Sequence, residues 1–284
     1  MRSLQYASTL ALLASGLVFA AQEQSGWRKS DETSPNPTNA SPNPTNLTDT
    51  QVQDIITKFA AKETDFARAR ENYTYRQTAR VQELDAGGSP QGRWEMVTDI
   101  IFSPDGKRTE RVVRAPVETL RNILLTPEDE ADLRSVQPFV LTTGEIPKYY
   151  VRYVGKQNAD EIPCYVFAVK PKKLEKGQRY FEGQIWVDDR DLQIVKSYGR
   201  GVGIVGKNNM FAKFETYREQ IDGKYWFPTY TRADDVLPFE AGPQRIRMLV
   251  KYENYKQFKS DVNIQFGGEA NAQPQSKPAQ KPKP

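Results

Sequence analysis

Three glycines have the spacing of a phosphate-binding loop. Gly201, Gly203 and Gly206 match the dinucleotide-binding pattern, but that pattern binds phosphates only where a strand meets a helix of a βαβ unit. The residues that follow are polar and then aromatic, without helical periodicity. We therefore interpret the stretch as a loop between two strands, which could form the rim of a cavity.

A cluster of aspartates could in principle bind calcium. Asp188, Asp189 and Asp191 lie close together in the sequence. A calcium loop also needs a carboxylate at its twelfth position and flanking helices, and neither is present in the pattern. A solvated hairpin turn is the better interpretation, and we predict no metal site.

Paired carboxylates could act as a general acid and a general base. The candidate pairs are Glu182 with Glu215 and Asp234 with Asp235. The strand periodicity puts these residues at outward or turn positions, and nothing in the sequence brings them together. We predict a protein that is not an enzyme, with no catalytic residues and no cofactor.

Composition excludes further kinds of chemistry. The chain has no histidine, the side chain that titrates near neutral pH and binds most transition metals. Cys164 is the single cysteine, so the chain forms no internal disulfide. It lies in an apolar strand without a nearby cation or helix start that would lower its pKa. We expect it to be a buried core residue.

The charge of the chain is mild. The net charge is +4, and the basic residues form no concentrated stripe along the sequence. We therefore predict no nucleic-acid partner. The densest basic stretch is Lys170–Lys176. It has the composition of a solvated hairpin loop, and the alternative is a transient contact with anionic headgroups at a membrane surface.

The chain divides into four segments by composition. Residues 1–20 resemble a signal peptide, with an apolar run too short to span a bilayer, so we expect an exported, periplasmic protein. Residues 21–47 contain the tandem repeat SPNPTN and form a spacer, and residues 261–284 form a polar tail. A single domain remains at 48–260.

The domain begins with one amphipathic helix and continues mainly as strands. Apolar residues recur at helical spacing from about Thr48 to Arg70. About ten segments then have strand character, which is many for one open sheet. The segment Leu120–Leu141 interrupts them and predicts two short helices. We predict an α+β fold in which a strongly curved antiparallel sheet, a half-open barrel, wraps on the helix under a short helical cover.

Alternation along two strands shows which side chains should face the interior. In the strand Arg179–Val187 the inward set includes Gly183, where we expect the strand to bend. If the helix fills the concave side incompletely, the remainder is an apolar cavity. The predicted lining set comprises Phe181, Ile185, Val187, Ile246, Met248, Val250 and Tyr252.

The order of elements resembles a known family. A phrase G-x-I-W-V-D (Gly183–Asp188) and a later phrase GKYWFPT (Gly223–Thr229) follow a helix, a three-strand meander and a helical insertion. This resembles the LolA-like, outer-membrane lipoprotein-sorting superfamily. The resemblance implies a half-open barrel that shelters a lipid or the acyl chains of a lipoprotein, and we expect the protein to be a monomer. An interaction or sensor module of the cell envelope with the same fold is the alternative.

Overall fold

The computed structural model describes residues 47–103, 107–135, 139–203, 212–239 and 241–258. The chain divides into two units, 1–39 and 40–284, and every described residue belongs to the second. The predicted signal peptide, nearly all of the predicted spacer and the predicted tail lie outside the described residues. Those three assignments remain predictions.

The helix α1 (Asp49–Arg70) begins at a complete capping box. Thr48 N donates to Gln51 Oε1 at 2.9 Å, and Gln51 N donates to Thr48 Oγ1 at 3.3 Å. These two bonds satisfy backbone groups that have no partner within the helix. One face of α1 is buried, as its sequence pattern predicts: Ile55, Ile56, Phe59, Ala60, Glu63 and Phe66.

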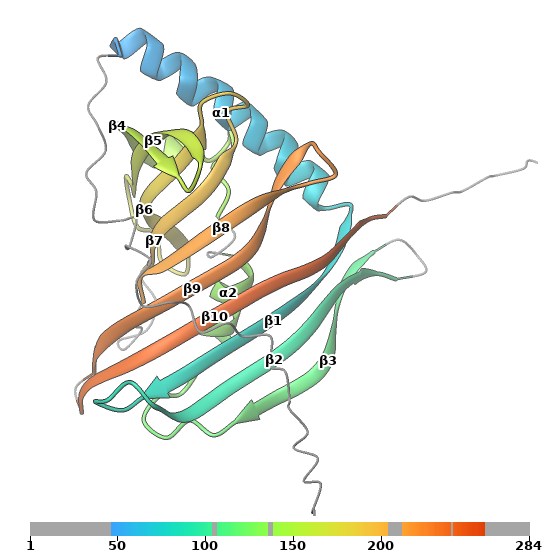
Figure 1. Cartoon of the computed structure of the whole chain (residues 1–284), viewed down its shortest axis with the longest axis vertical. Helices are drawn as coiled ribbons and strands as arrows, with labels where there is room; N and C mark the ends of the chain where they lie inside the picture. The colour runs from blue at the N-terminus through green and yellow to red at the C-terminus, as the bar shows by residue number, and fades with distance from the viewer. Residues whose placement is uncertain (1–46, 104–106, 136–138, 204–211, 240, 259–284) are drawn as a thin grey trace, which may run out of the picture. The chain divides into compact units, whose positions relative to one another are not determined.

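All the strands of the described residues form one open antiparallel sheet, as predicted (Figure 1). Its order is β3-β2-β1-β10-β9-β8-β7-β6-β5-β4, so β3 and β4 are the two edges. The last strand, β10, pairs with β1 and joins the opening meander to the remaining strands. The strands are β1 (Tyr73–Leu84), β2 (Pro90–Phe102), β3 (Arg108–Glu118), β4 (Tyr149–Ala159), β5 (Ile162–Pro171), β6 (Arg179–Asp188), β7 (Ile194–Gly203), β8 (Phe214–Ile221), β9 (Tyr225–Phe239) and β10 (Gly242–Gln257).

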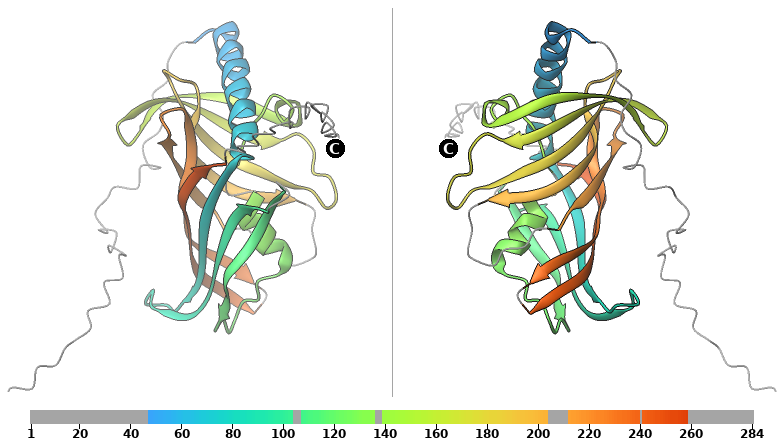
Figure 2. Two further views of the ribbon diagram at one scale, coloured as in Figure 1. Left: turned by 90° about the vertical axis from the view of Figure 1, so that its right-hand side faces the viewer. Right: turned by 90° about the vertical axis from the view of Figure 1, so that its left-hand side faces the viewer.

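The short helix α2 (Pro127–Ser135) and α1 occupy the inside of the curved sheet (Figure 2). The prediction of two helices in the insertion is wrong for Leu120–Leu125, which forms no helix. The buried Glu83 carboxylate accepts the backbone N–H groups of Arg121, Asn122 and Ile123. The segment is irregular, and these bonds tie its backbone to β1.

Close approach of β6 and β7 requires two glycines opposite each other. Gly183 pairs with Gly199. A Cβ atom on Gly183 would collide with the Tyr198 carbonyl oxygen, and the Phe181 ring lies within 2.8 Å of both Cβ positions. The glycine predicted from the sequence as a bending point is therefore needed because the backbone and a ring occupy its side-chain space.

The main core lies between the sheet and the two helices. Phe59 of α1 packs on Phe167 of β5 with ring centroids 5.3 Å apart, and Leu133 of α2 belongs to the same cluster. A second, smaller cluster lies on the opposite face of the sheet: Ala159, Cys164, Val166, Trp186 and Val195. Strands β5, β6 and β7 therefore carry buried apolar side chains on both faces.

Candidate functional site

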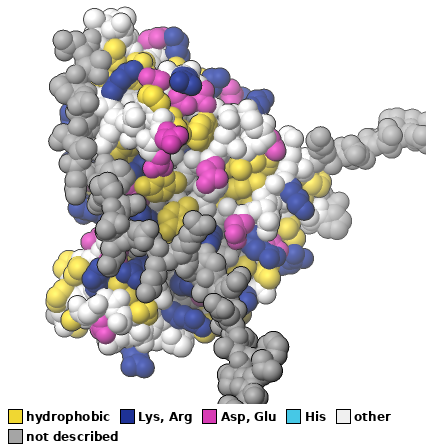
Figure 3. All heavy atoms as spheres, viewed as in Figure 1, with side chains coloured by type: hydrophobic (Ala, Val, Ile, Leu, Met, Phe, Trp, Pro, Cys, Tyr) yellow, Lys and Arg dark blue, Asp and Glu magenta, His cyan; other side chains and the backbone are white. Residues whose placement is uncertain are grey.

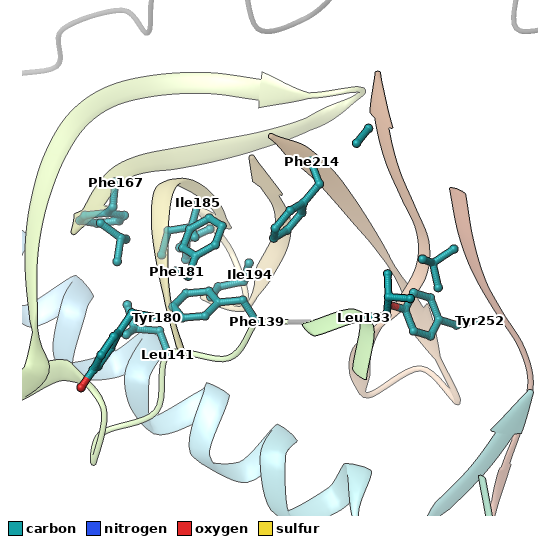
Figure 4. Packing of buried hydrophobic residues seen from close by; sticks show 14 of the residues in the cluster. Leu133, Phe139, Leu141, Phe167, Tyr180, Phe181, Ile185, Ile194, Phe214 and Tyr252 are labelled. Atoms are coloured by element: carbon teal, nitrogen blue, oxygen red, sulfur yellow. The ribbon is translucent and has the colours of Figure 1, made fainter. Parts of the chain in front are cut away.

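The concave face of the sheet carries every member of the predicted lining set in a buried position. All of them except Ile246 belong to the main core cluster, together with residues of α1 and α2. Figure 4 shows Phe181, Ile185 and Tyr252 among the side chains of this cluster. The inward facing predicted from alternation agrees with this burial, while their contact with a ligand remains a prediction.

The predicted lining set lies under two different covers. Phe181 of β6 stacks on Phe139, with ring centroids 4.5 Å apart and planes inclined by 23°. On β10, Tyr252 lies beside Leu133 of α2 (Figure 4). Gln77 of β1 donates through Nε2 to the Leu133 carbonyl oxygen at 3.1 Å, which holds α2 against this part of the sheet. Phe139 therefore covers the β6 part of the predicted lining set, and α2 covers the β10 part.

An ion pair next to α2 is poorly solvated. Arg179 Nε of β6 lies 3.3 Å from Asp132 Oδ1 of α2, and both side chains are largely buried. Burial raises the pKa of Asp132 to about 6, against the opposing effect of Arg179. The charge of Asp132 on α2 therefore changes with pH in the mildly acidic range.

The sequence did not reveal the ion pair that joins α1 to the sheet. Arg218 Nη1 of β8 lies 3.0 Å from Glu63 Oε1, and both side chains are almost fully buried. Glu63 also accepts Ile194 N, and Arg218 donates to the Phe139 carbonyl oxygen. The one available signal was that Glu63 falls on the apolar face of α1, four residues after Phe59.

The outer face of the sheet holds a second buried network. Lys196 Nζ lies 2.6 Å from Glu215 Oε1 and 5.0 Å from the Trp186 ring. Arg232 Nε lies 2.8 Å from the other carboxylate oxygen of Glu215. Burial raises the pKa of Glu215, but the two cations outweigh it and the pKa lies below its usual value. Glu215 therefore stays ionised, unlike a general acid.

The other proposed carboxylate pair also has partners of its own. Asp234 lies 2.9 Å from Arg245 Nε and 3.0 Å from Arg247 Nη2. These arginines hold the pKa of Asp234 below its usual value, although burial alone would raise it. Asp235 accepts the backbone N–H of Lys213 at 2.9 Å. Asp234 is thus held as a carboxylate by cations, a state unlike that of a proton donor.

Asp189 and Asp191 lie in the β6–β7 hairpin turn, as the sequence predicted, but Asp188 ends β6 and is buried rather than solvated. Asp188 accepts Arg190 N, and Asp191 accepts both Gln193 N and Trp226 Nε1. Asp189 pairs with Lys156 Nζ at 2.8 Å. Within the described ranges, no group of three or more acidic, cysteine or histidine side chains is placed to hold a metal ion.

The glycine stretch lies partly in a strand rather than wholly in a loop. Gly201 and Gly203 are residues of β7, while Gly206 lies outside the described residues. Their neighbours in the sheet are the antiparallel strands β6 and β8. The loop prediction is wrong for these two residues because Gly201 pairs with Phe181 of β6, so the strand continues through the glycine-rich sequence.

Outward charges of the meander form ion pairs with one another. Asp99 of β2 lies 2.7 Å from Arg76 Nε of β1 and 2.9 Å from Arg111 Nη2 of β3. Figure 3 shows acidic, basic and hydrophobic side chains interspersed on the visible face. No helix in the described part of the chain has the length and apolar character that crossing a bilayer requires.

A pocket of about 310 Å³, here named the α1–β3 pocket, lies between the end of α1 and the start of β3. None of the predicted lining set lines it. The buried Tyr75 and Ile100 form its apolar part, and the remaining lining residues are polar or charged. Its lining residues are Arg70, Tyr75, Ile100, Arg108, Thr109 and Glu110.

Comparison with known proteins gives similarity of fold alone. No family model and no curated protein matches the chain. A DUF1329 family protein from Desulfovibrio piger is 17% identical with a TM-score of 0.36, covering 75% of this chain and 94% of that one. A LolA superfamily protein from Nitrosomonas europaea is 12% identical with a TM-score of 0.31, covering 72% and 92%. MucB is 14% identical with a TM-score of 0.26, covering 71% and 93%. All three identities are below 25% and all three TM-scores are below 0.5, so these similarities decide neither the family nor the function of this chain.

Proposed function

We propose that this chain is an exported, periplasmic binding protein that shelters a hydrophobic ligand against the concave face of its sheet. The ligand would be a lipid or the acyl chain of a lipoprotein, and a role in lipoprotein sorting at the outer membrane is the specific form of this proposal. Binding, not catalysis, is the activity. The observation that carries it is the aromatic and aliphatic lining of an open, curved sheet.

The chemistry of the concave face supports this proposal. An acyl chain needs apolar surface without unpaired polar groups, because burying a polar group without a hydrogen bond costs free energy. All members of the predicted lining set except Tyr252, whose hydroxyl is a buried polar group, supply such surface from β6 and β10. Each buried methylene of a ligand would add about 0.8 kcal/mol to binding.

Ligand uptake requires the cover to move. Phe139 and Leu133 occupy the space next to the predicted lining set. The polar contacts of their segment include Gln77 to the Leu133 carbonyl, Arg218 to the Phe139 carbonyl, Asp132 to Arg179, and Glu83 to the backbone of residues 121–123. An acyl chain that displaced Leu133 from Tyr252 would replace one apolar contact by another.

One observation favours a second candidate function, an envelope interaction or sensor module. The edge strand β3 is exposed along its entire length. Val112, Val113 and Val117 are 55%, 47% and 44% exposed. An exposed edge offers unpaired backbone groups to an extended segment of a partner protein. In this alternative the interior stays filled and β3 recruits the partner.

The deciding experiment is purification of the mature protein from its native envelope without detergent exchange, followed by native mass spectrometry and lipid extraction. A stoichiometric lipid or acylated species supports the binding function. Protein that is free of lipid and also fails to take up a fluorescent apolar probe contradicts it. Co-purification of an unlipidated protein instead would support the interaction module.

A matched pair of variants tests the location. Leu133→Ala removes apolar cover beside Tyr252 and should increase uptake of the apolar probe. Arg247→Gln changes an exposed residue of the same strand β10 that pairs with Asp234, and should leave uptake unchanged. Equal uptake by both variants would contradict binding on the concave face.

A further inference from the structure

The α1–β3 pocket combines an apolar floor with charged walls. Tyr75 of β1, Ile100 of β2 and Glu110 of β3 lie side by side in the sheet register. Tyr75 and Ile100 are buried members of the core cluster. The floor of the pocket is therefore continuous with the apolar interior.

An exposed apolar residue extends this floor along β3. Val112 lies two residues beyond Glu110 and pairs with Thr98. The side chains of Glu110 and Val112 therefore project to the same face of the sheet. Val112 is 55% exposed. The face of β3 that holds the pocket thus offers apolar surface that none of the described residues covers completely.

Two arginines give the pocket its charge. The Arg108 guanidinium lies 5.7 Å from the centroid of the Tyr75 ring, which holds its charge over the floor. Arg70, the last residue of α1, forms another part of the wall. With Glu110 the ionisable wall residues sum to +1 (two arginines minus one glutamate). An arginine fork matches the oxygens of a carboxylate or a phosphate better than any other side chain.

An aromatic pair lies next to Arg108. Phe102 pairs with Arg108 in the register of β2 and β3. Its ring stacks on that of Phe258, with centroids 4.4 Å apart, and Phe258 is 40% exposed. The surroundings of the pocket therefore present apolar area beside positive charge. An anionic amphiphile, which has a negative head and an apolar chain, is complementary to this combination.

We propose that the α1–β3 pocket binds the anionic head of a single-chain amphiphile, with Arg70 and Arg108 on its carboxylate or phosphate and the first methylenes over Tyr75 and Ile100. This inference rests on the proposed binding function and names the ligand class more closely. The volume of the α1–β3 pocket, about 310 Å³, is at the lower end of the range for small-molecule pockets. It suits a head group and the beginning of a chain, and the remainder of the chain would run toward the concave face.

The test measures binding of three monomeric probes to the mature full-length protein, below the concentration at which each probe aggregates. Hexadecanoate carries a carboxylate, hexadecyl phosphate a phosphate, and hexadecanol no charge. Both anions should bind at least tenfold more tightly than hexadecanol. The ratio of the two anions identifies the preferred head group.

Variants separate the head group from the chain. Arg108→Gln and Arg70→Gln should each weaken hexadecanoate binding about tenfold, the value of one charge-assisted hydrogen bond, and leave hexadecanol binding unchanged. Arg111→Gln is the matched control on β3, because Arg111 faces Asp99 on the outer side. Glu110→Gln should strengthen hexadecanoate binding, a gain that misfolding cannot produce.

Each contrary outcome is distinct. Equal affinity for hexadecanoate and hexadecanol, with no effect of Arg108→Gln, overturns the head-group site and leaves the proposed binding function intact. Failure of all three probes to bind overturns both. Binding only to vesicles that contain anionic lipid, and not to the monomeric probes, also overturns the pocket and indicates a contact with the membrane surface.

Discussion

Glu63 of α1 and Arg218 of β8 form an ion pair, 3.0 Å apart, that is buried between the helix and the sheet. The pair connects the covering helix to a central strand through groups that water does not reach. The Arg218 guanidinium also lies 5.0 Å from the Phe66 ring. The position of α1 over the sheet therefore depends on charges as well as on apolar contact.

Glu63→Leu should destabilise the protein by about 3 to 5 kcal/mol, because it leaves the buried charge of Arg218 without its partner. The double variant Glu63→Leu with Arg218→Met should be more stable than Glu63→Leu alone. Urea denaturation measures both. Asp54→Ala is the control, since it removes an exposed ion pair with Lys58 and should change stability by less than about 1 kcal/mol. A double variant as unstable as the sum of the singles would contradict the coupling.

Glu83→Gln should loosen the segment that leads to α2. The Glu83 carboxylate accepts three backbone N–H groups, at distances between 2.6 and 3.0 Å. An amide retains one acceptor oxygen and places an NH₂ group where acceptors are needed, so a loss of about 1 to 3 kcal/mol is expected. Hydrogen exchange of the Arg121, Asn122 and Ile123 amides should become faster. Glu71→Gln changes an exposed carboxylate and should leave these amides protected.

Gly183→Ala should destabilise the sheet far more than Gly144→Ala. A Cβ atom at Gly183 meets backbone of β7, which cannot move without disturbing the strand pairing, whereas the nearest atom at Gly144 is 3.8 Å away. We expect a loss of at least about 2 kcal/mol for Gly183→Ala, typical of overpacking. Thermal denaturation distinguishes the two variants. Similar melting temperatures would show that the β6–β7 approach can relax.

Stability should decrease as pH rises from about 4 to 6 because of Asp132. Its pKa in the folded chain is about 6, above the ordinary value of 3.8, because it is buried. The folded state therefore holds more protons than the unfolded state in this range, and stability falls as those protons are lost. The resulting decrease in the free energy of unfolding is at most about 3 kcal/mol. Denaturation at pH 4.5 and at pH 7 measures this effect. The difference in the free energy of unfolding between the two pH values should be smaller in Asp132→Asn than in the unmodified protein.

Asp99 gives the opposite sign at lower pH. The hydrogen bond from Arg76 contributes most to lowering the pKa of Asp99 to about 2. Its ion pairs stabilise the fold above the ordinary carboxyl pKa, and this stabilisation is lost as pH falls from about 4 to 2. Asp99→Asn should flatten the acid side of the stability profile. An unchanged slope in both aspartate variants would contradict these assignments.

Much of the fold could be predicted from local pattern. The capped helix, the ten strands and the inward facing along β6 and β10 follow from periodicities of 3.6 and 2 residues, which depend only on neighbours in the chain. The hairpin turn at Asp188 is local for the same reason. The irregular course of Leu120–Leu125 could not be predicted, because it depends on Glu83, which lies about forty residues earlier in the sequence.

The candidate site was predictable only in part. Alternation identified Phe181, Ile185 and Met248 as interior residues, but it could not say that Phe139 and Leu133 would pack against them. The α1–β3 pocket was not predicted, since Arg70, Tyr75, Ile100 and Arg108 come from four different elements. No pattern within one element records their proximity.

The sequence by itself determined an antiparallel sheet with one apolar helix, and it excluded histidine and disulfide chemistry, because these depend on residue type and short-range spacing. Only the tertiary structure decided how full the concave side is, which buried charges meet, and where the pocket lies. Those properties depend on how surfaces distant in the chain fit together, and packing of that kind is a cooperative property of the whole domain.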